Sequence, residues 1–227
     1  SIKTHLKNHP TRKAYYPGAF QIHQDFIDAH PEAILLSDTP DDHLPWTFIP
    51  NLDIENPDDI CFKREPFGGI ISDISIKANS ISEYLDTVVD YTNKHFWGSL
   101  SVNIIVHPKS FQQPEVARAV ERAITNLNYG TVSVNMLAFY SSFFMVCPWG
   151  AFPGHDIYDI QSGMGKNFNF LMLDRTEKVV IKAPFNRIDP LTVKAKKPYV
   201  FAKKLAGFEA FPSITKLIDL MVSAIRD

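Results

Sequence analysis

A glycine-rich segment in the second half of the chain contains the residues whose types first suggest chemistry. Residues 147–165 read CPWGAFPGHDIYDIQSGMG and are followed by Lys166. A phosphate-binding loop requires G-x-x-x-x-G-K-[ST], in which backbone N–H groups and the lysine contact the phosphates and the hydroxyl contacts the metal. The glycines before Lys166 lack that spacing, and Asn167 replaces the hydroxyl residue. The dinucleotide pattern G-x-G-x-x-G also fails, because Phe168 occupies the third glycine position. The segment therefore predicts a surface loop with turn glycines.

The two cysteines are the residues to consider next as nucleophiles. A reactive thiol needs a cationic neighbour or a helix N-terminus to lower its pKa. Cys61 follows two aspartates, which would raise the pKa of its thiol, and Cys147 lies between Val146 and Pro148. We therefore expect both to be buried structural cysteines. Two cysteines do not form a disulfide scaffold, which favours a reducing, cytoplasmic location.

The eight histidines suggest a metal site, but their spacing argues against one. His5 and His9 are four residues apart in a basic segment that ends at Pro10, and no carboxylate or thiol completes a ligand set at helical spacing with His107 or His155. We expect no metal site. The serine-nucleophile pattern G-x-S-x-G is also missing from the sequence.

Composition limits the function classes. The chain has 227 residues, of which 45% are hydrophobic, and a formal net charge of -2. This length allows one large domain or two small ones. A near-neutral chain creates no strong field toward nucleic acid or acidic membranes. The longest apolar run, residues 136–149, is too short and too interrupted to span a bilayer. We expect neither nucleic acid nor a membrane as a partner.

Hydrophobic periodicity predicts alternating strands and helices. In the first part of the chain it predicts a helix over 18–30, with Phe20, His23, Phe26 and Ile27 near one face, and a loop-rich segment over 37–59. Later predictions include a capping box formed by Ser80 and Glu83, Pro114 in a first helical turn, and a helix stop at Gly130. The expected strands are 46–49, 69–77, 99–106 (buried), 131–135 and 178–183, and the later helices are 80–95, 114–128 and two within 198–226. This order predicts an α/β fold in which a parallel-stranded layer packs with helices.

Residues 64–69, REPFGG, form a second dense segment, just before a predicted strand. They are typical of a strand-entry turn. They could also present the Glu65 carboxylate to a ligand, because a carboxylate can accept two hydrogen bonds from ribose hydroxyls. The residue types alone favour the turn.

Taken in order, several segments resemble the C-terminal part of the aldehyde dehydrogenase superfamily. Glu65-Pro66-Phe67-Gly68 resembles that family's E-x-F-G turn, and residues 96–102 (FWGSLSV) resemble its Y-G-L-x-A-x-V strand. Residues 130–135 (GTVSVN) resemble G-T-V-x-V-N. Residues 148–152 and 161–165 resemble a stretched copy of P-F-G-G-x-K-x-S-G-x-G, and residues 178–183 resemble a strand used in subunit contacts. The resemblance covers residues 60–183, within a catalytic-domain portion over 1–183. Residues 184–227 would form a C-terminal helical extension.

The resemblance implies roles for four residues. Glu65 would accept hydrogen bonds from the ribose on the nicotinamide side of NAD or NADP, and Phe67 would pack near the nicotinamide. Trp149 and Phe143 would line the pocket for a small-molecule aldehyde. Several residues between Phe152 and Gln161 exceed the family pattern, so the identity of the aldehyde does not carry over.

The resemblance also implies what this chain lacks. In the family, the glutamate base, the oxyanion-binding asparagine, the nucleophilic cysteine and the dinucleotide-binding domain all lie upstream of E-x-F-G. Cys61, only four residues before Glu65, does not fit that cysteine. We therefore expect the C-terminal portion of an NAD(P)-dependent oxidoreductase that converts aldehydes to carboxylic acids. It would be inactive alone, would pair with the upstream dinucleotide-binding half of the same protein, and would form a homo-oligomer.

Two alternatives remain open. The first is a non-catalytic relative that serves as a binding or assembly module. The second is an unrelated α/β enzyme whose site consists of Glu65, His155 and Asp156.

Overall fold

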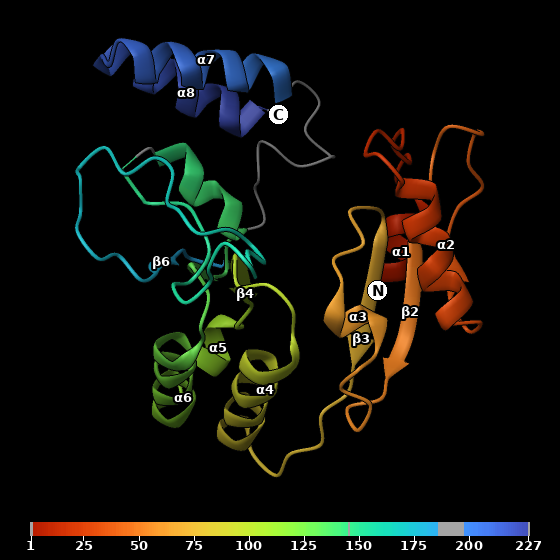
Figure 1. Cartoon of the computed structure of the whole chain (residues 1–227). Helices are drawn as coiled ribbons and strands as arrows, with labels where there is room; N and C mark the ends of the chain where they lie inside the picture. Colours follow the sequence, from red (N-terminus) through yellow and green to blue (C-terminus); the bar gives the residue numbers. More distant parts are fainter. Residues whose placement is uncertain (1, 145, 186–197, 227) are drawn as a thin grey trace. The chain divides into compact units, whose positions relative to one another are not determined.

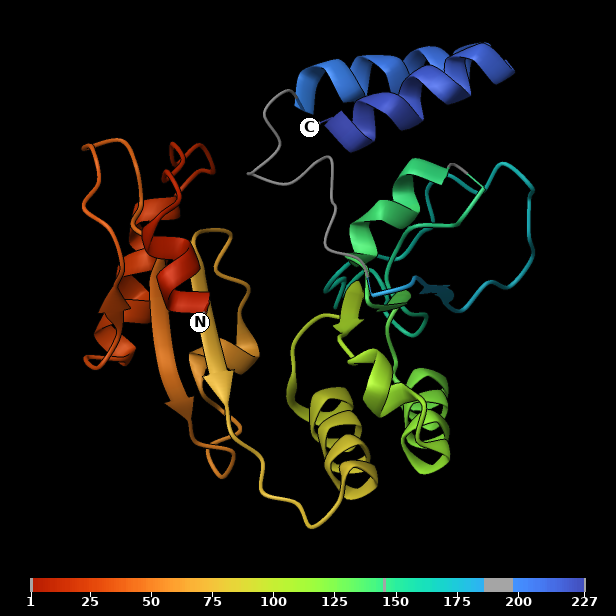
Figure 2. The same ribbon diagram turned by 180° about the vertical axis from the view of Figure 1, so that it is seen from behind.

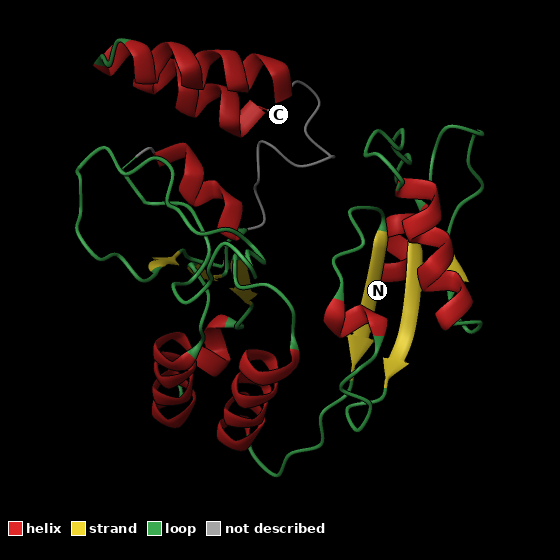
Figure 3. Cartoon of the chain, in the orientation of Figure 1, coloured by secondary structure: helices red, strands yellow, loops and turns green. Residues whose placement is uncertain are grey.

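The computed structural model describes residues 2–144, 146–185 and 198–226, without the side chains of residues 143, 198, 225 and 226. The chain divides into two compact units, residues 1–183 and 184–227. The first unit contains two three-stranded sheets with their helices, and the second contains two helices (Figures 1 and 3). The fold is mixed α/β with parallel strands, as predicted at that level.

The first sheet has the order β1-β2-β3, with β1 antiparallel to β2 and β2 parallel to β3. Its strands and the helices of the same segment are α1 (Ile2–Lys7), α2 (Ala19–Ala29), β1 (Ile34–Leu35), β2 (Thr47–Leu52), α3 (Ile60–Lys63) and β3 (Ile70–Ile74). A cluster of Phe26, Ile49, Leu52 and Phe62 forms the core here. The segment predicted as loop over 37–59 thus contains a strand that runs three residues beyond the predicted 46–49.

Phe20 does not lie on the buried face of α2, where the sequence pattern placed it. Phe26 is only 1% exposed, whereas Phe20 is 49% exposed and Ile22 packs against the core cluster instead. The reason is geometric. Phe20 lies six residues before Phe26, which places the two side chains roughly 120° apart around an α-helix.

The second sheet has the order β4-β5-β6 and is entirely parallel. Its elements are α4 (Ile81–His95), β4 (Ser101–Ile104), α5 (Pro108–Phe111), α6 (Pro114–Asn126), β5 (Thr131–Val134), the 3₁₀ helix η1 (Ala138–Phe144) and β6 (Val179–Lys182). The central strand β5 is buried at every position. Helices α4 and α6 lie side by side in both views (Figures 1 and 2) and share a core cluster with β5.

Three expectations about these elements need correction. Strand β3 pairs with β2 in the first sheet, so the predicted alternation does not build one continuous layer. The segment predicted as a buried strand over 99–106 becomes β4, which is only partly buried because it lies at an edge of its sheet. Helix α6 also ends at Asn126, two residues before the predicted boundary.

The second unit consists of α7 (Pro198–Ala210) and α8 (Ile214–Arg226), which pack against each other. The Ser213 hydroxyl accepts a hydrogen bond from the Lys216 N–H near the start of α8. Within the described part of the chain, no helix is both long and apolar enough to cross a membrane.

The Ser80 half of the predicted capping box at α4 is present, whereas the Glu83 side chain contacts Asn79, one residue before the N-cap. Ser80 Oγ accepts a hydrogen bond from the Glu83 N–H at 3.1 Å, and the Glu83 carboxylate accepts one from the Asn79 N–H at 2.8 Å. Ser80→Ala should therefore lower the free energy of unfolding by about 1 kcal/mol, because an N–H of the first turn loses its acceptor. Urea denaturation followed by circular dichroism measures this change. Ser80→Asp is the control, since its carboxylate can still cap. Equal losses for both substitutions would contradict the capping role.

Candidate functional site

The glycine-rich segment belongs to a long loop between η1 and β6 that packs against the start of the second sheet. Residues 147–178 contain no helix and no strand beyond isolated bridges (Figure 3). Trp149 and Asn167 form one such bridge through two backbone hydrogen bonds of 2.9 and 2.7 Å. The Phe152 N–H donates to the Ser99 carbonyl, two residues before β4, at 3.1 Å. This loop, residues 147–178, therefore packs against the amino end of β4 and is called the glycine-rich layer below.

Two glycines allow backbone segments to stack directly in this loop. A Cβ on Gly130 would lie 1.6 Å from the Gly150 carbonyl oxygen, and a Cβ on Gly150 would lie 2.1 Å from the Gly165 carbonyl oxygen. Both contacts involve backbone atoms, which cannot rotate away as a side chain could. Glycine is therefore needed at positions 130 and 150 for close approach.

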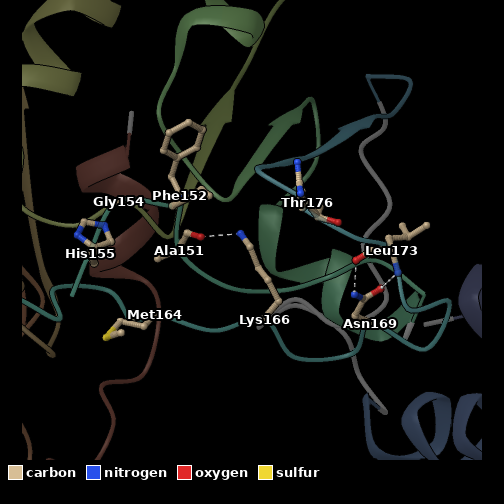
Figure 4. Close-up of a pocket in the computed structure, with 12 residues that line it drawn as sticks. Ala151, Phe152, Gly154, His155, Met164, Lys166, Asn169, Leu173 and Thr176 are labelled. Atoms are coloured by element: carbon tan, nitrogen blue, oxygen red, sulfur yellow. Dashed lines mark hydrogen bonds between the residues drawn. The ribbon is translucent and has the colours of Figure 1, made fainter. Parts of the chain in front are cut away.

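Lys166 ties the same layer together. Its Nζ donates to the carbonyl oxygen of Ala151 at 2.5 Å (Figure 4) and to those of Glu177 at 3.1 Å and Gly150 at 3.3 Å. Burial lowers the pKa of Lys166. An ammonium group has three donors, and here backbone carbonyls accept all of them. Lys166 therefore links three backbone positions of this loop.

A small pocket of about 240 Å³ lies beside Lys166. Its lining includes Phe152, His155, Met164 and Asn169 (Figure 4). His155 Nε2 lies 2.7 Å from Ser99 Oγ, so the imidazole is held at the amino end of β4. Open α/β sheets bind ligands outside the carboxyl ends of their strands. The pocket thus lies near the amino end of β4, whereas a ligand is expected at the carboxyl ends of the strands.

The carboxyl ends of β4 and β5 carry an amide network. Asn103 Oδ1 accepts hydrogen bonds from Ser133 Oγ at 2.9 Å and from the Ala138 N–H at 2.6 Å. Asn135 Oδ1 accepts one from the Val106 N–H at 2.8 Å. These side chains hold the start of η1 and the end of β4 in place.

The two residues with an implied cofactor role lie in the turn between α3 and β3. Glu65 and Phe67 are both exposed. Phe67 has a φ of 45°, and its ring centroid lies 5.3 Å from that of Tyr16. A non-glycine residue with positive φ is uncommon and marks a constrained turn. The strand-entry turn is therefore present, and it leaves the Glu65 carboxylate open to solvent.

The two residues with an implied substrate role lie elsewhere. Trp149 forms the bridge described above and is half-buried. Phe143 belongs to η1, and its side chain lies outside the described part of the structure. Glu65, Phe67 and Trp149 do not line the Lys166 pocket. The alternative site of Glu65, His155 and Asp156 also gains no support, because Asp156 accepts hydrogen bonds from the Tyr158 and Asp159 N–H groups in a local turn.

A second polar cluster was missed by the sequence reasoning. His30, Asp59 and Cys61 converge beside the first sheet, with ligating atoms all within 4.8 Å of one another. Burial, with a further contribution from the Asp59 charge, raises the pKa of Cys61 to about 12. This direction was predicted from the aspartates before it. Helical spacing could not reveal this cluster, because His30 lies 29 residues before Asp59 and 31 residues before Cys61.

No protein-family model matches this chain, and no curated protein is similar to it at a significant level. The aldehyde dehydrogenase resemblance consequently rests on the quoted sequence segments alone.

Proposed function

We propose that this chain is the C-terminal portion of an NAD(P)-dependent aldehyde dehydrogenase-like oxidoreductase that oxidises a small-molecule aldehyde to a carboxylic acid. The packing of the glycine-rich layer is the observation that supports this proposal most. Gly130 begins the segment that resembles G-T-V-x-V-N, and its Cα faces the Gly150 carbonyl of the segment that resembles P-F-G-G. Gly150 in turn meets Gly165 of the S-G-x-G segment. Three resembling segments thus converge through contacts that only glycine permits.

The proposed cofactor contact uses the exposed turn before β3. The Glu65 carboxylate would accept hydrogen bonds from two ribose hydroxyls, and the exposed Phe67 ring would pack near the nicotinamide. Trp149 and Phe143 would form walls of the aldehyde pocket.

The nucleophile would come from the upstream half of the same protein. A cysteine attacks as its thiolate, and Cys61, with a pKa of about 12, is protonated at neutral pH. In the proposed reaction the upstream thiolate would add to the aldehyde carbonyl, and NAD or NADP, held beside Glu65 and Phe67, would supply the hydride acceptor that oxidises the adduct to a thioester. Water finally hydrolyses the thioester to the acid and regenerates the thiol. The chain described here would supply cofactor contacts, pocket walls and contacts within a homo-oligomer.

The complete reading frame and the 227-residue chain should be compared for aldehyde-dependent reduction of NAD and NADP. We expect turnover by the complete protein and none by this chain alone. Glu65→Gln in the complete protein should lower kcat/KM about 10- to 100-fold, since a hydrogen bond to a charged group contributes about 1.5–3 kcal/mol. Glu115→Gln, a substitution of a first-turn residue of α6, serves as the matched control.

Three outcomes would contradict the proposal. One is turnover by the isolated chain, and another is an upstream frame without a dinucleotide-binding domain and a cysteine. The third is a Glu65→Gln enzyme as active as the Glu115→Gln enzyme.

A second candidate function is a non-catalytic binding or assembly module. The loop between the Trp149 bridge and β6 exposes large apolar side chains, namely Ile157, Tyr158, Ile160, Met164, Phe170, Leu171, Met172 and Leu173. Exposed apolar clusters of this kind are typical of interaction surfaces. Tight binding of NAD or NADP by the isolated chain would count against this second function.

A further inference from the structure

The cluster beside the first sheet brings three different metal-binding groups together. His30 follows the last turn of α2, Asp59 caps the N-terminus of α3, and Cys61 lies in the first turn of α3. His30 Nε2 is 3.0 Å from Asp59 Oδ1 and 3.6 Å from Cys61 Sγ. The His30 and Asp59 side chains are each only 9% exposed. Two segments of the chain thus place an imidazole, a carboxylate and a thiol around one point.

The two separations from His30 Nε2 are close to those in the coordination shell of a zinc ion, and the Asp59–Cys61 separation is within 4.8 Å. Zinc–ligand distances of roughly 2.0–2.3 Å with tetrahedral angles require neighbouring ligand atoms to be roughly 3.3–3.6 Å apart. The His30–Cys61 separation of 3.6 Å has this value, and the His30–Asp59 separation of 3.0 Å needs an increase of only a few tenths of an ångström. A thiolate and a carboxylate would also neutralise the two positive charges of the ion, which favours binding at a site with little solvent exposure.

The second nitrogen of His30 provides an independent indication. His30 Nδ1 lies 2.9 Å from Glu32 Oε1. Metal-binding histidines almost always donate their other N–H to a carboxylate, a carbonyl or water, which fixes the ring orientation and the tautomer. With Nδ1 held by Glu32, His30 presents Nε2 to the point shared by Asp59 and Cys61.

We propose that His30 Nε2, an Asp59 carboxylate oxygen and Cys61 Sγ bind one Zn²⁺ ion, with Glu32 as the orienting partner of His30. Three protein ligands leave the fourth tetrahedral position to water or to an external ligand. The ion would link the end of α2 to the start of α3. This site is independent of the proposed aldehyde chemistry, because none of its ligands belongs to the turn at Glu65 or to the glycine-rich layer.

Cobalt provides the test, because Co²⁺ occupies tetrahedral zinc sites and gives a thiolate-to-metal charge-transfer absorption when cysteine is a ligand. The tag-free 227-residue chain is treated with a chelator, kept reduced, and titrated with Co²⁺ and then Zn²⁺. We expect the absorption to saturate at one Co²⁺ per chain and to disappear on addition of Zn²⁺. The absence of a charge-transfer band would overturn the proposal.

The two cysteines provide matched variants, since the chain has only Cys61 and Cys147. The band should persist in Cys147→Ser, in which Cys61 is the only remaining thiol, and should be lost in Cys61→Ser. Because Cys147→Ser leaves the cluster intact, it decides the question even if Cys61→Ser does not fold. Loss of the band in Cys147→Ser, or its persistence in a folded Cys61→Ser, would overturn the assignment.

Glu32→Gln tests the orienting contact. Loss of such a partner typically weakens metal affinity about 10- to 100-fold, so we expect that change in the Zn²⁺ dissociation constant measured by competition with a fluorescent chelator. Glu115→Gln, in α6, is the control and should bind Zn²⁺ as the unmodified chain does. Equal affinities for the two variants would overturn the role of Glu32.

Discussion

Gly130→Ala should detach the glycine-rich layer from the second sheet. The new Cβ would lie 1.6 Å from the Gly150 oxygen, 2.8 Å from the Gly150 carbonyl carbon and 2.9 Å from the Ala151 carbonyl carbon. All three atoms belong to backbone, so relief requires movement of the loop, of the start of β5, or of both. Overpacking of this kind costs about 1–3 kcal/mol and occasionally more, and we expect the upper end of that range. Urea denaturation measures the loss, and limited proteolysis within the layer should become faster.

Gly165→Ala is the matched control for this prediction. It lies in the same layer, and a Cβ at this position would have no heavy atom within 4 Å. We expect its free energy of unfolding to change by less than about 0.5 kcal/mol. If Gly130→Ala were as stable and as resistant to protease as Gly165→Ala, the close backbone packing on which the proposed function depends would be refuted.

Phe26→Ala should cause the largest loss of stability among the substitutions considered. Phe26 is 1% exposed and belongs to the cluster with Ile49, Leu52 and Phe62 that joins α2 to the first sheet. Removing a buried phenyl ring costs about 3–5 kcal/mol, because the transfer free energy of the ring is lost and the cavity collapses only partly. The expected readout is a lower urea midpoint with an unchanged denaturant slope.

Phe20→Ala provides the comparison within the same helix. The side chain of Phe20 is 49% exposed, so the same chemical change should cost less than about 1 kcal/mol. A loss for Phe20→Ala equal to that for Phe26→Ala would show that burial does not distinguish these two faces of α2.

The local signals of the sequence determined most of the individual elements. The Ser80 cap, Pro114 at the start of α6 and the apolar run of β6 lie where the sequence placed them. These features depend on contacts within a few residues, such as a hydroxyl accepting from an N–H three positions later. Such contacts can be inferred from spacing alone, whereas the rise in the pKa of Cys61 comes first from burial and only then from the neighbouring Asp59.

Only the tertiary structure decided which elements meet. Periodicity shows that one face of an element is buried but not which partner buries it, so β3 could be predicted as a strand while its pairing with β2 could not. The same limit applies to the Gly130–Gly150 contact and to the convergence of His30 with Asp59 and Cys61. These groups are separated by about twenty to thirty residues in the chain, and no helical or strand period relates positions that far apart. The chemistry that we propose for them follows from how the chain folds back on itself.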